Sequence, residues 1–259
     1  MKVKYVIPVL LLCSAIVVRA QSPEEIVNKS REVMKVQSFE AYSTLLISDA
    51  RGNERIRQST MASRSYADGS EKRVIKFTSP PEVSGTGILI FDYKEKSDDL
   101  WIYLPALRQT RRIVSSEKSK SFMGSEFSNS DMTAPSVKDF TYKLLGSEKM
   151  DEKECWKIEA VPVNSALKDE YGYSKSVLFI SKSDYVPMMT EYYNFDGELF
   201  KTIKTLGYQL LDKVKGKYMV TDMLATNLKN GRKSEMKMDK IQQAETDEQY
   251  FTVTWLEKN

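Results

Sequence analysis

The residues with the most distinctive chemistry are two aromatic side chains followed closely by a cluster of arginines. They are Trp101 and Tyr103, then Arg108, Arg111 and Arg112. Apolar rings beside guanidinium groups suit a ligand with an apolar body and an anionic head, such as a phospholipid or an acylated chain. Core packing together with a basic surface strand is the alternative interpretation. Under the first interpretation, the three arginines contact a head group or an acidic partner.

Further apolar candidates flank this cluster on both sides. The loop 121–127 is too apolar for a purely solvated turn, and methionines on later strands (Met188, Met189, Met219 and Met223) are flexible groups that suit a variable apolar ligand. Gap-filling in a core explains these methionines nearly as well. The predicted acyl-chain contacts are Leu89, Phe91, Trp101, Tyr103, Phe122, Met123, Met189 and Met223.

Other candidate chemistry is weak, and the absence of histidine removes most hydrolase mechanisms and histidine-based metal sites. Gly85-Thr86-Gly87 leads into a predicted strand, whereas a dinucleotide fingerprint opens a helix. Adjacent acids at Asp98-Asp99 fit a solvated turn better than a cation site. We therefore expect no catalytic residue, metal or cofactor, and we expect that the protein is not an enzyme.

Residues 1–20 have the pattern of a cleaved signal peptide. Lys2 and Lys4 form its positive end, a short apolar run follows, and Val18-Arg19-Ala20 is a plausible cleavage site. The apolar run is shorter than the ~20 residues that span a bilayer. A lipid anchor through Cys13 is the alternative, although the bulky Leu12 precedes that cysteine. We expect a periplasmic protein.

The charge balance bears on the class of partner. Lys and Arg number 39 against 36 Asp and Glu, but the predicted leader holds three of the bases and no acid. The mature chain is therefore neutral, which argues against nucleic-acid binding through bulk charge.

The elements that position these residues are mostly strands. Ser22-Pro23-Glu24-Glu25 predicts the start of a short amphipathic helix. Period-two alternation and glycine turns (Asp68-Gly69, Asp196-Gly197 and Asn230-Gly231) then predict strands near 39–49, 54–66, 72–78, 86–94, 99–104, 137–147, 154–163, 174–182, 187–195, 199–211, 217–228, 232–241 and 250–256. We expect a mainly β, antiparallel fold with one domain over 21–259.

Two of these strands indicate a cavity. In 86–93, Ile88 and Ile90 oppose Leu89 and Phe91, and 100–104 is likewise apolar on both faces. Such strands are covered on both sides, or are covered on one side and line a cavity on the other. By contrast, 199–205 alternates imperfectly, as an outer or edge strand does.

One block of the sequence resembles a known family. It comprises Asp99-Leu100-Trp101-Ile102-Tyr103-Leu104-Pro105-Ala106-Leu107, Arg111-Arg112-Ile113, and Ser121-Phe122-Met123-Gly124-Ser125-Glu126-Phe127 with Asp131. This order and spacing is similar to the outer-membrane lipoprotein-sorting (LolA-like) family. The resemblance implies a LolA/LolB-like half-barrel whose helices cover a hydrophobic cavity for acyl chains. It suggests no named catalytic residue.

The resulting functional hypothesis is a periplasmic carrier that binds lipid or lipoprotein acyl chains and transfers them toward the outer membrane. Its expected partners are an inner-membrane transporter and an outer-membrane acceptor. Two alternatives stay open at this point: a lipid-sensing or accessory subunit of an envelope lipid transporter, and a histidine-free lipid esterase.

Overall fold

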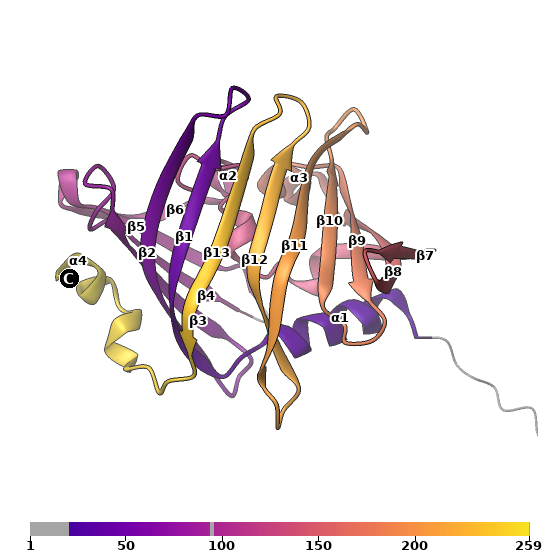
Figure 1. Ribbon diagram of the computed structural model, residues 1–259, viewed down its shortest axis with the longest axis horizontal. Coiled ribbons are helices and arrows are strands. Elements are labelled where there is room, and N and C mark those ends of the chain that lie inside the picture. Colours follow the sequence, from indigo (N-terminus) through magenta and orange to yellow (C-terminus); the bar gives the residue numbers. More distant parts are fainter. Residues whose placement is uncertain (1–20, 94–95, 259) are drawn as a thin grey trace, which may run out of the picture.

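A computed structural model describes residues 21–93 and 96–258, and the predicted leader with Cys13 lies outside these residues. Thirteen antiparallel strands form one strongly curved, open sheet in the order β6-β5-β4-β3-β2-β1-β13-β12-β11-β10-β9-β8-β7 (Figure 1). The strands are β1 (Ser38–Ser48), β2 (Glu54–Ser65), β3 (Glu71–Ser79), β4 (Gly87–Asp92), β5 (Asp99–Leu104), β6 (Gln109–Ile113), β7 (Phe140–Met150), β8 (Lys153–Pro162), β9 (Lys175–Ser181), β10 (Pro187–Tyr193), β11 (Leu199–Asp212), β12 (Lys217–Asn227) and β13 (Lys233–Gln242).

The helices are short and lie on both faces of this sheet. They are α1 (Pro23–Met34), α2 (Ser115–Lys118), α3 (Ser165–Tyr171) and α4 (Val253–Lys258), with 3-10 turns η1 (Pro105–Leu107), η2 (Ser130–Met132), η3 (Val137–Asp139) and η4 (Glu248–Phe251). Among the described residues, no helix is both long and apolar enough to cross a membrane.

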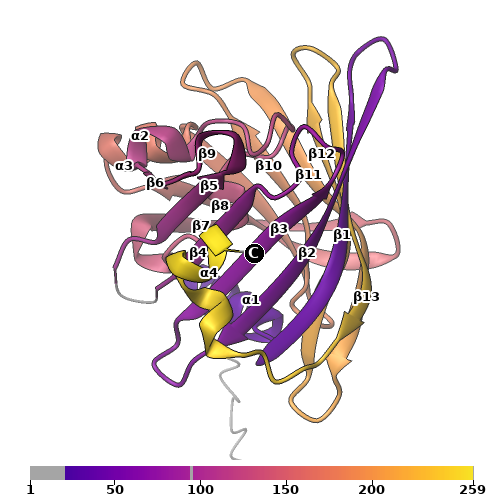
Figure 2. The same cartoon turned by 90° about the vertical axis from the view of Figure 1, so that its left-hand side faces the viewer.

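Helix α1 begins where the sequence predicts. The Ser22 hydroxyl accepts a hydrogen bond from the Glu25 backbone N–H at 3.2 Å, and the Glu25 carboxylate accepts one from the Ser22 N–H at 2.8 Å. This reciprocal cap fixes the helix start. Its apolar side, Ile26 and Val27, packs on Ile158 and Ile180 of the sheet, which places α1 against the concave face (Figures 1 and 2).

The segment 114–139 crosses the concave side, because it joins β6 to β7, which are the two opposite edges of the sheet. We call it the crossing segment. It inserts Phe122, Phe127 and Met132, each at most 6% exposed, into the core that the inner side chains of β1 to β5, β12 and β13 form. The chain thereby fills one side of its own concavity.

The C-terminal segment covers the outer face of the sheet. Phe251 and Leu256 are buried there against Leu89, Ala62 and Val74, and Figure 2 shows α4 outside β3 and β4. Gly87 allows this close approach, because a Cβ at this position would lie 2.5 Å from the Leu256 side chain. The prediction of a strand over 250–256 is wrong: these residues lie in and between η4 and α4, where Phe251 and Leu256 pack on the sheet.

The other predicted strands are confirmed within a few residues, and the three predicted glycine turns have positive φ at Gly69, Gly197 and Gly231. Strand β6 is absent from the predicted ranges, because its sequence Gln-Thr-Arg-Arg-Ile has no apolar alternation, although the alternative interpretation of the arginine cluster named a basic surface strand. The assignment of 199–205 to an edge is also wrong, since β11 lies between β10 and β12. Its alternation is imperfect because Lys201, only 8% exposed, points inward with Ile203.

Candidate functional site

A cavity of about 470 Å³ lies between α1, the concave face of the sheet and the end of the crossing segment. Its walls come from α1, from residues 131–135, and from the concave face of β1 to β3, β7 to β10, β12 and β13. Its size is in the ordinary range for small-molecule sites. The crossing segment and α1 leave this part of the concave face unfilled.

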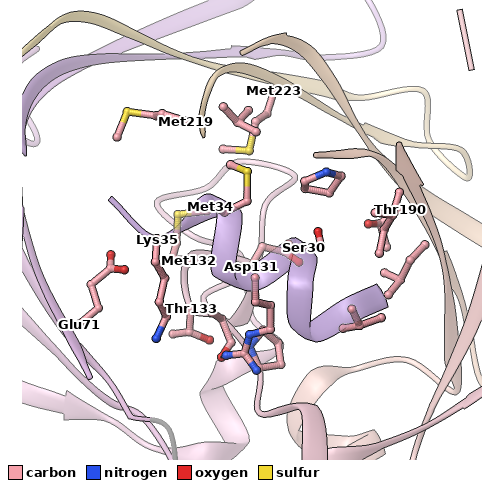
Figure 3. A pocket seen from close by; sticks show the side chains of 18 of the residues that line it. Ser30, Met34, Lys35, Glu71, Asp131, Met132, Thr133, Thr190, Met219 and Met223 are labelled. Carbon is pink, nitrogen blue, oxygen red and sulfur yellow. The ribbon is translucent and has the colours of Figure 1, made fainter. Parts of the chain in front are cut away.

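Methionine is the most frequent residue in the lining. Seven of the chain's twelve methionines face the cavity, namely Met34, Met61, Met132, Met219, Met223, Met236 and Met238. Met223 lies directly opposite Met236 across the β12–β13 ladder, and Figure 3 shows Met34 of α1 close to Met223. Thioether side chains are unbranched and polarizable, so this wall can adapt to apolar groups of different shape.

One part of the wall carries charged side chains. Arg31, Lys35, Glu71, Arg73 and Asp131 line it, and Figure 3 shows Lys35, Glu71 and Thr133 away from Met219 and Met223. The two carboxylates have cationic partners, since Glu71 lies 2.5 Å from the Arg73 guanidinium and Asp131 lies 2.7 Å from the Lys201 ammonium. The cavity therefore has an apolar side and a charged side.

The Asp131–Lys201 pair joins the crossing segment to the sheet. The side chains are 6% and 10% exposed, the Asp131 carboxylate also accepts the Ser128 N–H at 2.7 Å, and the Lys201 ammonium lies 4.3 Å from the centroid of the Tyr192 ring. Burial, and then Asp131, raise the pKa of the Tyr192 hydroxyl far above its ordinary value. This hydroxyl is therefore neutral near pH 7, and the charge at this point belongs to the ion pair.

A second buried carboxylate supports the same segment from behind the cavity wall. Asp92 is 5% exposed and accepts the Ala134 N–H at 2.7 Å. Burial, together with the nearby Asp98 carboxylate, raises the pKa of Asp92 to about 7. Burial raises the pKa of Asp98 as well. Asp92 therefore carries less negative charge near neutral pH than an exposed aspartate does.

The structure separates the eight predicted acyl contacts. Met223 lines the cavity, whereas Phe122 packs with its ring centroid 6.3 Å from that of Phe77 in the core, and Met189 packs near Phe179. Met123, at φ 50°, is partly buried in the crossing segment. The other four, Leu89, Phe91, Trp101 and Tyr103, lie on the outer face under η4 and α4. Contact of any of them with an acyl chain stays a prediction.

The three predicted head-group arginines lie apart from the cavity. Arg108 is exposed in the turn before β6, Arg111 pairs with Glu117 at 2.7 Å, and Arg112 pairs with Asp99. None of them lines the cavity described above. Their role toward a partner or a head group also stays a prediction.

Sequence reasoning missed Met34 and the charged pair Arg31 and Lys35, which α1 turns toward the cavity. The available signal was their spacing: Arg31 and Lys35 are four residues apart, and Met34 lies on the apolar side of the predicted helix. That spacing identifies a shared helix face, but the packing of α1 decides what the face meets.

Comparisons with known proteins agree with this architecture. A putative outer membrane lipoprotein-sorting protein domain from Vibrio parahaemolyticus is 27% identical, with a TM-score of 0.82 over 91% of this chain and 98% of that one. A DUF1329 family protein from Desulfovibrio piger is 27% identical, with a TM-score of 0.81 over 90% and 97%. A LolA superfamily protein from Nitrosomonas europaea, 21% identical with a TM-score of 0.68 over 91% and 100%, shares the fold.

No curated protein matches the chain. A family model, whose members are described as uncharacterized proteins, matches residues 69–258, which is well over half of the sequence. This range contains the block 99–131 and every strand from β3 onward. The chain therefore belongs to this family of uncharacterized proteins, and it shares the fold of the LolA superfamily structure.

Proposed function

We propose that the protein binds an acyl chain in the methionine-lined cavity and carries it through the periplasm. The observation that supports this most directly is the lining itself: seven methionines surround unfilled space beneath a helix in a fold shared with lipoprotein-sorting proteins. An apolar space of this size gains free energy when apolar groups leave water and enter it. Residues 21–259 act in this proposal as one lipid-binding domain.

The size of the cavity favours a single chain. If a methylene group occupies about 30 Å³, the share of a water molecule in the liquid, the cavity holds roughly sixteen of them. At ~0.8 kcal/mol for each buried methylene, such a chain gains on the order of 13 kcal/mol before the costs of association. That gain is enough to keep a lipid chain out of water during transfer.

The proposed mechanism is stoichiometric, and the protein acts as a carrier rather than as an enzyme. A signal peptide over 1–20 would deliver it to the periplasm, and the similarity to the Vibrio lipoprotein-sorting domain supports this localisation. The cargo is a lipid or the acyl chains of a lipoprotein. An inner-membrane transporter would load the protein, and an outer-membrane acceptor would unload it.

Displacement of an apolar fluorescent probe tests the proposal. Delipidated protein should take up phenylnaphthylamine, and dodecanol should displace it. Met223→Gln places an amide in the cavity wall and should weaken dodecanol binding about tenfold, because an unpaired polar group then faces the chain. Met189→Gln is the matched control, since Met189 packs outside this lining and its variant should bind dodecanol as the parent does.

Two results contradict the proposal. One is a delipidated parent protein that takes up no probe and no dodecanol. The other is an equal loss of affinity in both variants, which would place the binding site elsewhere.

A further inference from the structure

Two cations, Arg31 in α1 and Lys35 at its C-cap, face the cavity without a carboxylate partner in its wall. Arg31 and Lys35 are four residues apart, so both lie on one side of the last helical turn. Each makes one hydrogen bond to a backbone carbonyl: Arg31 Nη2 donates to Ala134 O at 2.7 Å, and Lys35 Nζ donates to Gly69 O at 2.6 Å. Both side chains are half-buried and line the cavity.

The charges in the wall do not cancel. Glu71 and Asp131 are the carboxylates of the lining, and each already has its own cation, Arg73 and Lys201 respectively. Within residues 21–93 and 96–258, no carboxylate forms an ion pair with Arg31 or Lys35. Arg31 and Lys35 are therefore the two cations of the lining that have no ion-paired carboxylate among the described residues.

The acids near these cations lie outside the lining. Asp98 is close enough to Arg31, and Asp68 to Lys35, for each pair to interact through charge. Asp98 is half-buried, and this partial burial raises its pKa, whereas Asp68 lies in the exposed turn between β2 and β3. A favourable interaction with the helix C-terminus explains a base in the last turn, but it does not explain why both bases line an apolar cavity.

We propose that Arg31 and Lys35 bind the anionic head of the ligand, a carboxylate or a phosphate, while its chain lies among the methionines. This inference rests on the proposed function and names the class of ligand: an amphiphile with one anionic oxygen-bearing group. The Arg31 guanidinium has further N–H donors besides the one bonded to Ala134 O, and it can donate hydrogen bonds to two oxygens of such a group at once. Lys35 adds a second charge one turn further along.

The arrangement also separates this head-group site from the arginine cluster around β6. Arg111 and Arg112 already pair with Glu117 and Asp99, and neither lines the cavity. Figure 3 shows the Lys35 side chain on the side away from Met219 and Met223, as an amphiphile with one polar end requires.

A matched series of ligands tests the inference by displacement of phenylnaphthylamine from the full chain. Dodecanol, dodecanoic acid, dodecyl phosphate and dodecyltrimethylammonium share one chain and differ in the head. The parent protein should bind the acid or the phosphate at least about tenfold more tightly than dodecanol, since hydrogen bonds to charged groups are the stronger class. The preferred anion distinguishes a fatty acid from a phospholipid as the source.

Variants should remove this preference, because they lower the affinity for the acid and the phosphate far more than the affinity for dodecanol. Arg31→Gln keeps an N–H donor for Ala134 O and removes the charge, and Lys35→Gln does the same at the second position; the double variant should bind the acid, the phosphate and dodecanol within about twofold of one another. Lys29→Gln is the control, because Lys29 is an exposed cation on the same helix that pairs with Glu32 at 3.3 Å. Thermal unfolding midpoints should stay close to that of the parent.

The outcomes are distinct. If dodecanol fails to displace the probe from the parent, the proposed function fails. If dodecanol binds but the acid and the phosphate bind no better, or if the double variant keeps the preference of the parent, the head-group assignment is wrong while the proposed function stands. Should one variant unfold, the single substitution at the other position decides the question.

Discussion

Removal of Lys201 should cost far more stability than removal of a neighbouring lysine on the same strand. Lys201→Met leaves the Asp131 carboxylate, which is 6% exposed, without its cation. Breaking a buried ion pair on one side typically costs about 3–5 kcal/mol, because a buried charge is left uncompensated. Lys204→Met is the matched control, since Lys204 pairs with Asp151 at 3.1 Å but the two side chains are 37% and 61% exposed. That loss should be about 0–1 kcal/mol.

Urea denaturation of the three proteins measures this difference. Because the free energy of unfolding of a domain is on the order of 5–15 kcal/mol, the Lys201→Met protein can be close to unfolding at room temperature. The double variant Lys201→Met with Asp131→Asn removes both charges and should recover part of the loss. If Lys201→Met unfolds at the same urea concentration as Lys204→Met, the pair is not a structural tie between the crossing segment and β11.

Three further predictions follow from burial and from the lining. Because the pKa of Asp92 is raised to about 7, the folded protein holds this proton more tightly than the unfolded chain does. The free energy of unfolding of the protein should therefore fall as the pH rises from about 4 to about 7. Asp92→Asn should reduce this pH dependence in urea titrations at several pH values. Leu256→Ala should lower the free energy of unfolding by about 2–5 kcal/mol while dodecanol affinity, measured by probe displacement, stays unchanged, because Leu256 packs on the outer face. Hypochlorite should convert cavity methionines to sulfoxides, which mass spectrometry detects, and should weaken dodecanol binding. After the same treatment, the double variant Met223→Leu with Met236→Leu should retain part of its affinity for dodecanol.

Features set by local sequence were predictable. The α1 cap needs Ser22 and Glu25 alone, and each glycine turn needs one residue with positive φ, so neighbours in the chain decide both. Strands with alternating side chains were found for the same reason. Strand β6 has no such alternation, and it is a strand because β5 supplies its hydrogen-bond partners, from Leu100 opposite Ile113 to Leu104 opposite Gln109.

The candidate site was harder to predict, because long-range packing decides which face of a strand meets the cavity. The apolar character of both faces of β4 correctly indicated that both are covered. Leu89 and Phe91 face the C-terminal segment, whereas Ile88 and Ile90 face the core. Nothing in residues 86–93 distinguishes these two sides, since the answer depends on α4, more than 150 positions later. The edge-strand prediction for 199–205 failed for a related reason. Lys201 points inward to Asp131, which is seventy positions away in the sequence.

The crossing segment, which contains the apolar motif Ser121–Phe127, limits the size of the cavity. Phe122, Phe127 and Met132 occupy the concave face beside β1 to β5, where the apolar lining would otherwise continue. The space beneath α1 is what remains, and its volume suits one chain. Since the packing of three side chains sets this limit, the apolar motif acts from within the fold as a filler. Replacing Phe122 should therefore enlarge the space open to a ligand as well as lower stability, and a broader range of bound lipids in the Phe122→Ala protein, seen by native mass spectrometry, would distinguish a filler from a direct contact.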